Sequence, residues 1–261
     1  MRDSQYDGQS KRDQAMLVLL AAEAVGRFAA KEVTAGRVLS GPVIDRLTAA
    51  ILDPDTRAFD AIGPVLRRMR ISNIDLSEVY FPQIARNLGC DWEADRVTFV
   101  QVSSGLARMQ SLQRQFCTDW AKDESQSSSA GRLLLILPNG EQHSFGPMVL
   151  LGQLRRSGFS VCLKIAPQPS ELRSLLKQDV FDGVLLSVAC REKLDACRSL
   201  LKTIKNASHG RLCVAVGGAV LASGVDVMAA TGADIVTNDP ATALAAFGLL
   251  MRVGARELKY A

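Results

Sequence analysis

The feature that most constrains the fold is a regular alternation of apolar and amphipathic segments after residue 130. The apolar segments have the length of strands and the amphipathic ones the length of helices. Strands are predicted at 132–137, 161–165, 183–188, 212–216 and 234–237, and helices at 146–157, 170–178, 191–206, 220–231 and 241–253. Five β and five α segments in alternation predict an α/β, flavodoxin-like, Rossmann-type doubly wound parallel five-stranded sheet. The nearly continuous apolar character of the strands agrees, because such strands are covered on both faces.

The first half of the chain lacks this alternation and reads as an N-terminal helical bundle. Helices are predicted at 13–34, 40–52, 56–69, 73–88 and 96–120. Ser40 is the expected cap of the second helix and Gly89 the expected end of the fourth. The last helix carries apolar residues at spacings of three and four, which predicts one buried face: Phe99, Val102, Leu106, Met109 and Leu112.

A change of composition predicts the domain boundary. Residues 121–130 are polar and rich in serine, as expected of a flexible linker. We therefore expect a helical domain at 1–120, with residues 1–12 disordered, and an α/β domain at 131–261.

Polar or small residues follow three of the predicted strands. His143, one of two histidines in the chain, lies in the segment Glu141–Gly146 after the first strand; Ser187 lies in the third, and Gly217 and Gly218 follow the fourth. Open α/β sheets bind ligands at the carboxyl ends of their strands. Each feature alone has an ordinary interpretation, since a lone loop histidine is usually a surface residue and a Gly-Gly pair is usually a tight turn. Their conjunction favours a ligand site.

These segments resemble the three signature positions of cobalamin (vitamin B12) binding domains. The usual first motif is Asp-x-His-x-x-Gly, and here Glu141 takes the place of the aspartate and Gly146 closes the motif. The resemblance covers residues 131–255. In the helical half, the segment 88–92 resembles the Leu-Gly-x-x-Trp segment of the bundle that caps the cofactor. The whole arrangement most resembles the AerR/PpaA photosystem antirepressors of purple bacteria.

The resemblance implies a cobalamin cofactor in its adenosyl, methyl or hydroxo form. His143 would be the metal ligand, binding cobalt through one ring nitrogen while Glu141 accepts a hydrogen bond from the other. Ser187 would bond the dimethylbenzimidazole of the nucleotide tail. Gly217 and Gly218 would let the backbone approach the tail closely, and the helix after them would favour its phosphate.

Four further residues concern the fit to this family. Trp92 resembles the tryptophan that shields the upper ligand, although an ordinary core tryptophan is about equally compatible with the sequence. Lys193 stands where enzymes of the family carry a serine that continues a proton relay, and we expect it to pair with Glu141 and keep it ionised. The positions that would supply an upper histidine hold Val102 and Ser103.

These departures favour a sensor over an enzyme. We expect a light- or redox-responsive transcriptional regulator, an antirepressor that acts through a partner repressor of the PpsR/CrtJ type. The main alternative is a stand-alone corrinoid methyl-carrier protein of a methyltransferase system. A haem-binding sensor of the same domain type is another, because one imidazole ligand suits iron as well as cobalt.

Composition sets the remaining expectations. The net charge of +4 is too small to argue for nucleic acid, so DNA binding is expected only indirectly or weakly. The six cysteines include no Cys-x-x-Cys pair, which argues against a zinc site, and Cys162 and Cys213 are expected to be buried. The polar first residues resemble no signal peptide, and no apolar run is long enough for a membrane span. We therefore expect a cytoplasmic protein.

Overall fold

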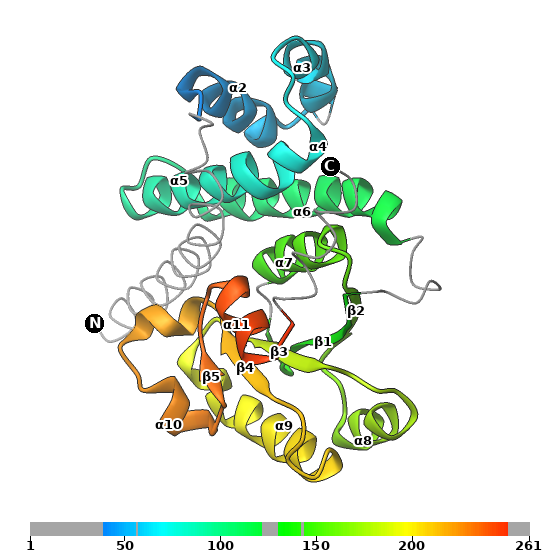
Figure 1. Cartoon of the computed structure of the whole chain (residues 1–261). Helices are drawn as coiled ribbons and strands as arrows, with labels where there is room; N and C mark the ends of the chain where they lie inside the picture. Colours follow the sequence, from blue (N-terminus) through cyan, green and yellow to red (C-terminus); the bar gives the residue numbers. More distant parts are fainter. Residues whose placement is uncertain (1–38, 56, 122–129, 142–143, 250–261) are drawn as a thin grey trace, which may run out of the picture. The chain divides into compact units, whose positions relative to one another are not determined.

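The computed structural model describes residues 39–55, 57–121, 130–141 and 144–249. The chain forms two compact units, one within residues 1–119 and the other within 120–261 (Figure 1). The expectation of disorder at 1–12 lies outside the described residues, and so does most of the expected linker. In the described part of the chain, no helix combines the length and the apolar character needed to cross a membrane.

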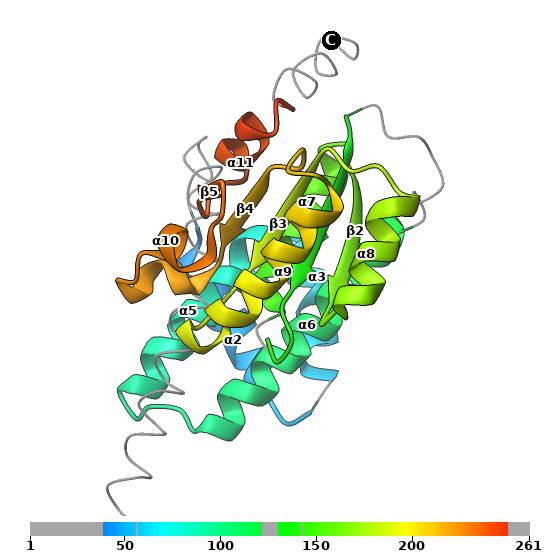
Figure 2. The ribbon, with the colours of Figure 1, turned by 90° about the horizontal axis from the view of Figure 1, so that it is seen from below.

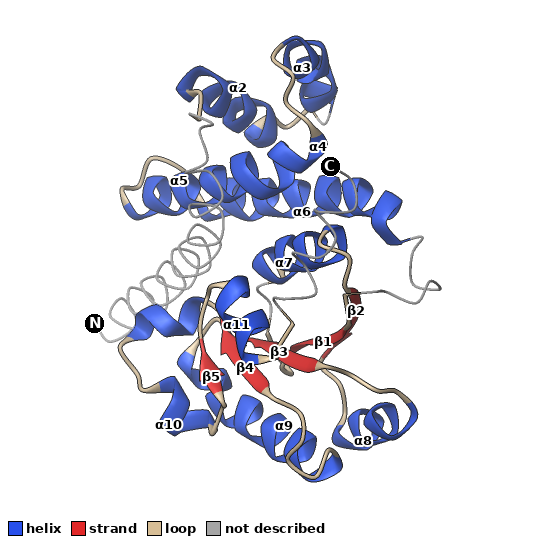
Figure 3. Cartoon of the chain, viewed as in Figure 1, coloured by secondary structure: helices blue, strands red, loops and turns tan. Residues whose placement is uncertain are grey.

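The described part of the first unit is helical throughout, as expected (Figure 3). Its elements, in chain order, are α2 (Gly41–Leu52), α3 (Arg57–Arg68), α4 (Asn73–Asp75), the π-helix η1 (Leu76–Tyr80), α5 (Phe81–Glu93) and α6 (Phe99–Ala121).

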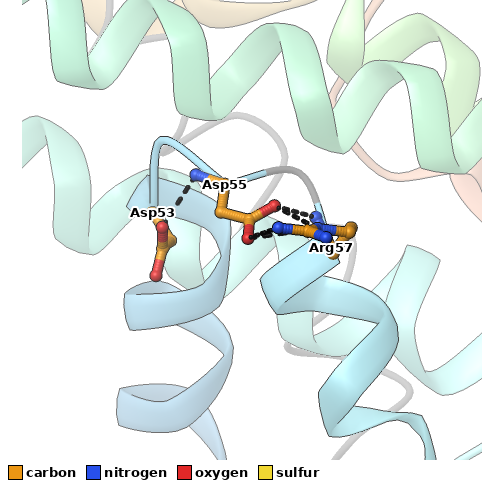
Figure 4. A network of polar contacts seen from close by, with 3 residues as sticks. All are labelled: Asp53, Asp55 and Arg57. Atoms are coloured by element: carbon orange, nitrogen blue, oxygen red, sulfur yellow. Dashed lines mark hydrogen bonds and ion pairs between the residues drawn. The ribbon is translucent and has the colours of Figure 1, made fainter.

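Local sequence explains several of the boundaries between these helices. The predicted start of α2 is confirmed, with Ser40 at the N-cap position and proline in the first turn. In the turn between α2 and α3, the N–H of Asp55 donates to Asp53 Oδ1 at 2.8 Å, and the Asp55 carboxylate pairs with Arg57 (Figure 4). This partner lowers the pKa of Asp55. The guanidinium of Arg108 on α6 donates to the carbonyl oxygens at the end of α2, which otherwise lack partners.

Two expectations for the helical unit were wrong. Gly89 does not end its helix: α5 continues to Glu93, and Gly89 is buried within it. The turn is made instead by Asp95, whose φ of 54° places it in the left-handed region. Phe99 does not join the buried face of α6, since half of its surface is exposed, whereas Val102 and Met109 are buried.

The second unit is the predicted five-stranded parallel sheet with helices on both faces. Its strands are β1 (Arg132–Leu137), β2 (Ser160–Ile165), β3 (Gly183–Ser187), β4 (Val214–Gly217) and β5 (Ile235–Val236), in the spatial order β2-β1-β3-β4-β5. Its helical segments are α7 (Phe145–Arg156), α8 (Pro169–Gln178), η2 (Arg191–Lys193), α9 (Leu194–Ala207), η3 (Ala219–Ser223), α10 (Val227–Thr231) and α11 (Pro240–Ala246).

Two hydrophobic clusters hold the helices against the sheet. Alternate residues of β1 point to opposite faces: Leu134 and Ile136 pack with α8, α9 and α10, and Leu133 and Leu135 pack with α7 and α11 (Figures 1 and 2). All four side chains are fully buried. Burial of one such side chain stabilises the fold by roughly 1.5–3 kcal/mol, so β1, an interior strand of the sheet, holds both layers in place.

The second unit differs from expectation in three details. The helix expected at 220–231 is divided into η3 and α10, with Gly224 between them at a φ of 74°. The segment after Gly218 is therefore a 3-10 helix of five residues, shorter than the helix that was expected to favour a phosphate. Cys162 and Cys213 are only half-buried, and Cys197 is the buried thiol among the described residues.

Candidate cofactor-binding site

The strand order creates a topological switch point between β1 and β3. Strand β1 connects to β2 on one side of it, and β3 connects to β4 on the other. The carboxyl ends of neighbouring strands are in register, with Ser187 of β3 opposite Gly217 of β4. Ligands of open α/β sheets bind at such a point, outside the carboxyl ends of the strands.

The side chain of Glu141 bridges this switch point, from the loop after β1 to the segment after β3. A tight turn after β1 brings it into place: its N–H donates to the Pro138 carbonyl at 3.1 Å, and Gly140 takes a φ of 74°. The carboxylate oxygen Oε2 then accepts the backbone N–H of Ala189, in the segment after β3, at 2.8 Å. The loop that follows β1 is thus fastened to the exit of β3, 48 residues further along the chain.

His143, the predicted metal ligand, lies outside the described residues, as does Gln142. The segments on either side of it are defined. Glu141 is anchored to Ala189, and the chain re-enters a helix where the Met148 N–H donates to the Ser144 carbonyl at 3.0 Å. Gly146 lies in the first turn of α7. The role of His143 stays a prediction.

The two strand-end glycines occupy positions where a side chain would collide with neighbouring backbone. A Cβ on Gly217 would lie 2.6 Å from the carbonyl oxygen of Thr237. A Cβ on Gly218 would overlap the backbone of Val188, and the φ of 114° and ψ of −179° at Gly218 belong to a region that glycine alone readily adopts. The two glycines thus approach the adjoining strand ends closely, and Ser187 is half-buried beside them. Their predicted approach to a nucleotide tail stays a prediction.

Asn238 completes this corner of the sheet, and sequence reasoning missed it. Its Oδ1 accepts the N–H of Gly218 at 2.6 Å, and its Nδ2 donates to the Gly218 carbonyl at 3.2 Å. A signal was present in the sequence: Asn238 directly follows the last predicted strand, as Gly217 and Gly218 follow the fourth. The neighbouring Asp239 caps α11, so the side chain of Asn238 is not needed as the cap of that helix.

Lys193 lies close to the turn that precedes Glu141. Its Nζ would lie 2.5 Å from a Cβ placed on Gly140, so the ammonium group covers that glycine. The charges of Lys193 and Glu141 also both influence the pKa of the Cys190 thiol. The structure thus brings Lys193 to the same corner as Glu141, and the predicted ion pair between them stays a prediction.

Cys190 is a thiol at this corner that sequence reasoning did not single out. Burial, a hydrogen bond involving Glu192 and the carboxylate of Glu141 together raise the pKa of Cys190 to about 11, although Lys193 opposes the shift. The group is therefore protonated near neutral pH, which makes it a poor metal ligand. Among the described residues, no group of three or more His, Cys, Asp and Glu side chains could hold a metal ion.

Trp92 belongs to the helical unit. It is half-buried near the end of α5, and its ring packs against that of Phe99 with centroids 5.8 Å apart and an interplanar angle of 53°. This contact explains why Phe99 leaves the buried face of α6. The predicted shielding of an upper ligand by Trp92 stays a prediction.

Comparison with known proteins places the fold. No known protein-family profile matches the chain. The monomethylamine corrinoid protein of Methanosarcina barkeri superposes with a TM-score of 0.57 at 17% identity, over 79% of this chain and 98% of that one. A cobalamin-binding protein from Desulfitobacterium hafniense is more distant, with a TM-score of 0.39 at 18% identity over 78% of this chain and 98% of that one.

A sequence relative gives the family. It is described as an uncharacterized 20.5 kDa protein in the bchF-crtJ intergenic region of Rhodobacter capsulatus. The two sequences are 35% identical over 191 residues, which is 73% of this chain and the whole of the relative. The chain therefore belongs to the same family as this Rhodobacter capsulatus protein.

Proposed function

We propose that the α/β unit binds cobalamin and that the protein is a light- or redox-responsive regulator, an antirepressor of photosynthesis genes. The observation that carries the cofactor proposal is the meeting of Glu141, Ser187 and the Gly217–Gly218 pair at one edge of the sheet, beside the topological switch point. The shared fold with a corrinoid protein is consistent with this proposal.

The donor set at this edge suits a corrinoid held by one axial imidazole. The loop that carries His143 is fastened on its near side by the Glu141 carboxylate and on its far side by α7. An acceptor two residues from a histidine in one loop would select the ring tautomer that leaves the other nitrogen for the metal. The backbone of the two glycines would admit the nucleotide tail. Adenosyl- or methylcobalamin, when bound, would supply a cobalt–carbon bond that light can break.

Two observations favour regulation over catalysis. The relative is described by its position between bchF and crtJ, and a repressor of the PpsR/CrtJ type is the partner that the sequence resemblance implies. Lys193 lies at the switch-point corner, at the position where enzymes of the resembled family carry a serine that continues a proton relay. We therefore propose a cytoplasmic, non-enzymatic protein that acts through this repressor.

The regulatory proposal is tested by operator binding of a PpsR/CrtJ-type repressor, measured with and without this protein. The protein is loaded with adenosyl- or hydroxocobalamin and kept in the dark or illuminated. We expect cobalamin-loaded wild type to weaken operator binding in one state of illumination or redox, and His143→Asn to lose the effect. His209→Asn is the matched control, because His209 is exposed in a turn and its φ of 52° suits asparagine.

The rival functions give different results in the same preparations. A Soret band after incubation with haem, without a cobalamin spectrum, would replace the B12 proposal by the haem-sensor one. A cobalamin spectrum that ignores light and redox, together with acceptance of a methyl group on the bound corrinoid, would replace the regulator by the methyl-carrier protein.

A further inference from the structure

We infer that Asn238 is a positioning residue for the nucleotide tail of cobalamin, because it fixes the conformation of the Gly217–Gly218 strand end. This inference rests on the proposed cofactor. It concerns a residue that none of the signature positions includes and that acts through the glycines.

The side chain of Asn238 continues the sheet where strand β5 ends. Strand β5 is paired with β4 only at Ala215–Ile235 and Val216–Val236, and one further ladder bond follows, from the Thr237 N–H to the Val216 carbonyl at 3.0 Å. The next pair of bonds is made by the Asn238 amide, which meets the N–H and the carbonyl of Gly218 at 2.6 and 3.2 Å. A carboxamide presents an acceptor and a donor side by side, as the C=O and N–H of one strand residue do, so it can replace a strand residue here.

On the opposite side, the same glycines are held by the exit of β3. The Val188 N–H donates to the Gly217 carbonyl at 2.9 Å, and the Val188 carbonyl accepts the N–H of Val220 at 3.2 Å. Gly218 is thus held between Val188 and Asn238 in a backbone conformation that glycine alone readily adopts, and the surrounding bonds impose it on a residue that could take many others. Without the Asn238 amide, the bonds that impose this conformation would remain on the Val188 side alone.

The amide chemistry of Asn238 is specific. Aspartate would still accept the N–H of Gly218, but it would set a carboxylate oxygen against the Gly218 carbonyl, which has no proton to give. Alanine would remove both bonds. The need to cap α11 does not explain why asparagine stands at position 238, because Asp239 is the cap. Asp239 accepts the N–H of Ala241 at 3.3 Å and the hydroxyl of Thr242 at 2.6 Å.

The test compares two corrinoids that differ only in the tail. Dissociation constants of hydroxocobalamin and of cobinamide, which lacks the nucleotide, are measured for wild type, Asn238→Ala, Asn238→Asp and the control Asn206→Ala. Asn206 is exposed on α9. We expect Asn238→Ala to weaken cobalamin binding about tenfold, the size of two lost neutral hydrogen bonds, while cobinamide binding changes less than about twofold. Asn238→Asp should fall between wild type and alanine.

Each outcome decides a separate question. Equal effects of Asn238→Ala on both corrinoids, or none on either, would overturn the positioning role. A wild type that binds cobalamin no better than cobinamide would overturn it as well, because the tail would then not use this strand end. If Asn238→Ala fails to fold, as judged by circular dichroism, the same comparison is decided by Asn238→Asp. A wild type that binds neither corrinoid would instead remove the proposed cofactor.

Discussion

The carboxylate of Glu141 accepts the backbone N–H of Ala189 at 2.8 Å, and this bond joins the loop after β1 to the exit of β3 across the switch point. Glutamate has one more methylene than the aspartate usual in the first motif, and it reaches a backbone group in a different segment of the sheet. The residue at the start of the first motif is therefore held to the segment after β3.

Loss of this bond should destabilise the α/β unit. We expect Glu141→Ala to lower the free energy of unfolding by about 1–2 kcal/mol, since hydrogen bonds to charged groups contribute about 1.5–3 kcal/mol and this carboxylate is only half-buried. Glu141→Gln keeps an acceptor and should cost less. Glu171→Gln is the control. It removes the charge of Glu171 from its ion pair with Lys164 at the surface and should cost under about 0.5 kcal/mol. Urea unfolding measures all three, and equal values for Glu141→Ala and the control would refute the anchoring role.

Gly218 and Gly232 should respond very differently to alanine. Both have a positive φ, 114° and 77°, but a Cβ on Gly218 overlaps Val188 and one on Gly232 meets no atom within 4 Å. We expect Gly218→Ala to cost about 3 kcal/mol or more, from overlap and backbone strain together. Gly232→Ala should cost about 1 kcal/mol, from the left-handed conformation alone. Thermal unfolding distinguishes them, and similar melting temperatures would contradict the close approach of Gly218 to β3.

Strand β1, an interior strand of the sheet, should carry much of the stability of the second unit. We expect Leu134→Ala to cost about 2–5 kcal/mol, because it leaves a cavity in a fully buried cluster. Val180→Ala is the control, since the valine is 86% exposed and its change should stay within about 0.5 kcal/mol. Denaturant unfolding with a probe in the α/β unit measures both. A loss below about 1 kcal/mol for Leu134→Ala would show that the strand is not packed on both faces.

Thiol reactivity should follow the pKa differences among the cysteines. Burial is the main cause that raises the pKa of Cys190 to about 11 and that of Cys197 to about 12, whereas Cys90 is exposed. With iodoacetamide at pH 8, mass spectrometry should find Cys90 alkylated well before the other two, because the thiolate is the reactive form. Faster labelling of Cys190 than of Cys90 would contradict the environment described for it.

The same thiols give a pH dependence of stability. Their pKa values in the folded chain lie above the ordinary value of 9.0, so the unfolded chain loses these protons first as the pH rises. Stability from this source is complete below pH 9 and is lost progressively from there toward pH 11–12. The Cys190→Ser variant should show a shallower decline above pH 9 in urea unfolding. A decline as steep as that of wild type would show that Cys190 does not contribute.

The sheet was predictable because its interior strands, β1, β3 and β4, are buried on both faces. Apolar runs such as Leu133–Leu137 are then nearly continuous in sequence, and the polar breaks between them mark the turns. The errors occur where tertiary contacts override local signals. Gly89 has the composition of a helix end, yet it lies buried within α5, and Phe99 continues an apolar spacing but packs on Trp92 outside the buried face.

The positions of the candidate site were predictable only in part. Ser187 and Gly217 end strands β3 and β4, and Glu141 and Gly218 lie shortly after strands. A parallel sheet brings strand ends together, so their shared edge follows from topology. Asn238 acts through bonds between β4 and the end of β5, and Ala189 contributes a backbone N–H that every residue but proline carries. Neither leaves a periodic signal in the sequence.

The central claim is tested most directly by titrating the purified protein with hydroxocobalamin in the dark and recording the visible spectrum. Wild type and His209→Asn should bind about one cobalamin per chain with a shifted spectrum. His143→Asn should bind at least about tenfold more weakly and without the shift, because the axial imidazole is gone. Binding by His143→Asn with the affinity and spectrum of wild type would contradict the account, and so would a wild type that binds no cobalamin.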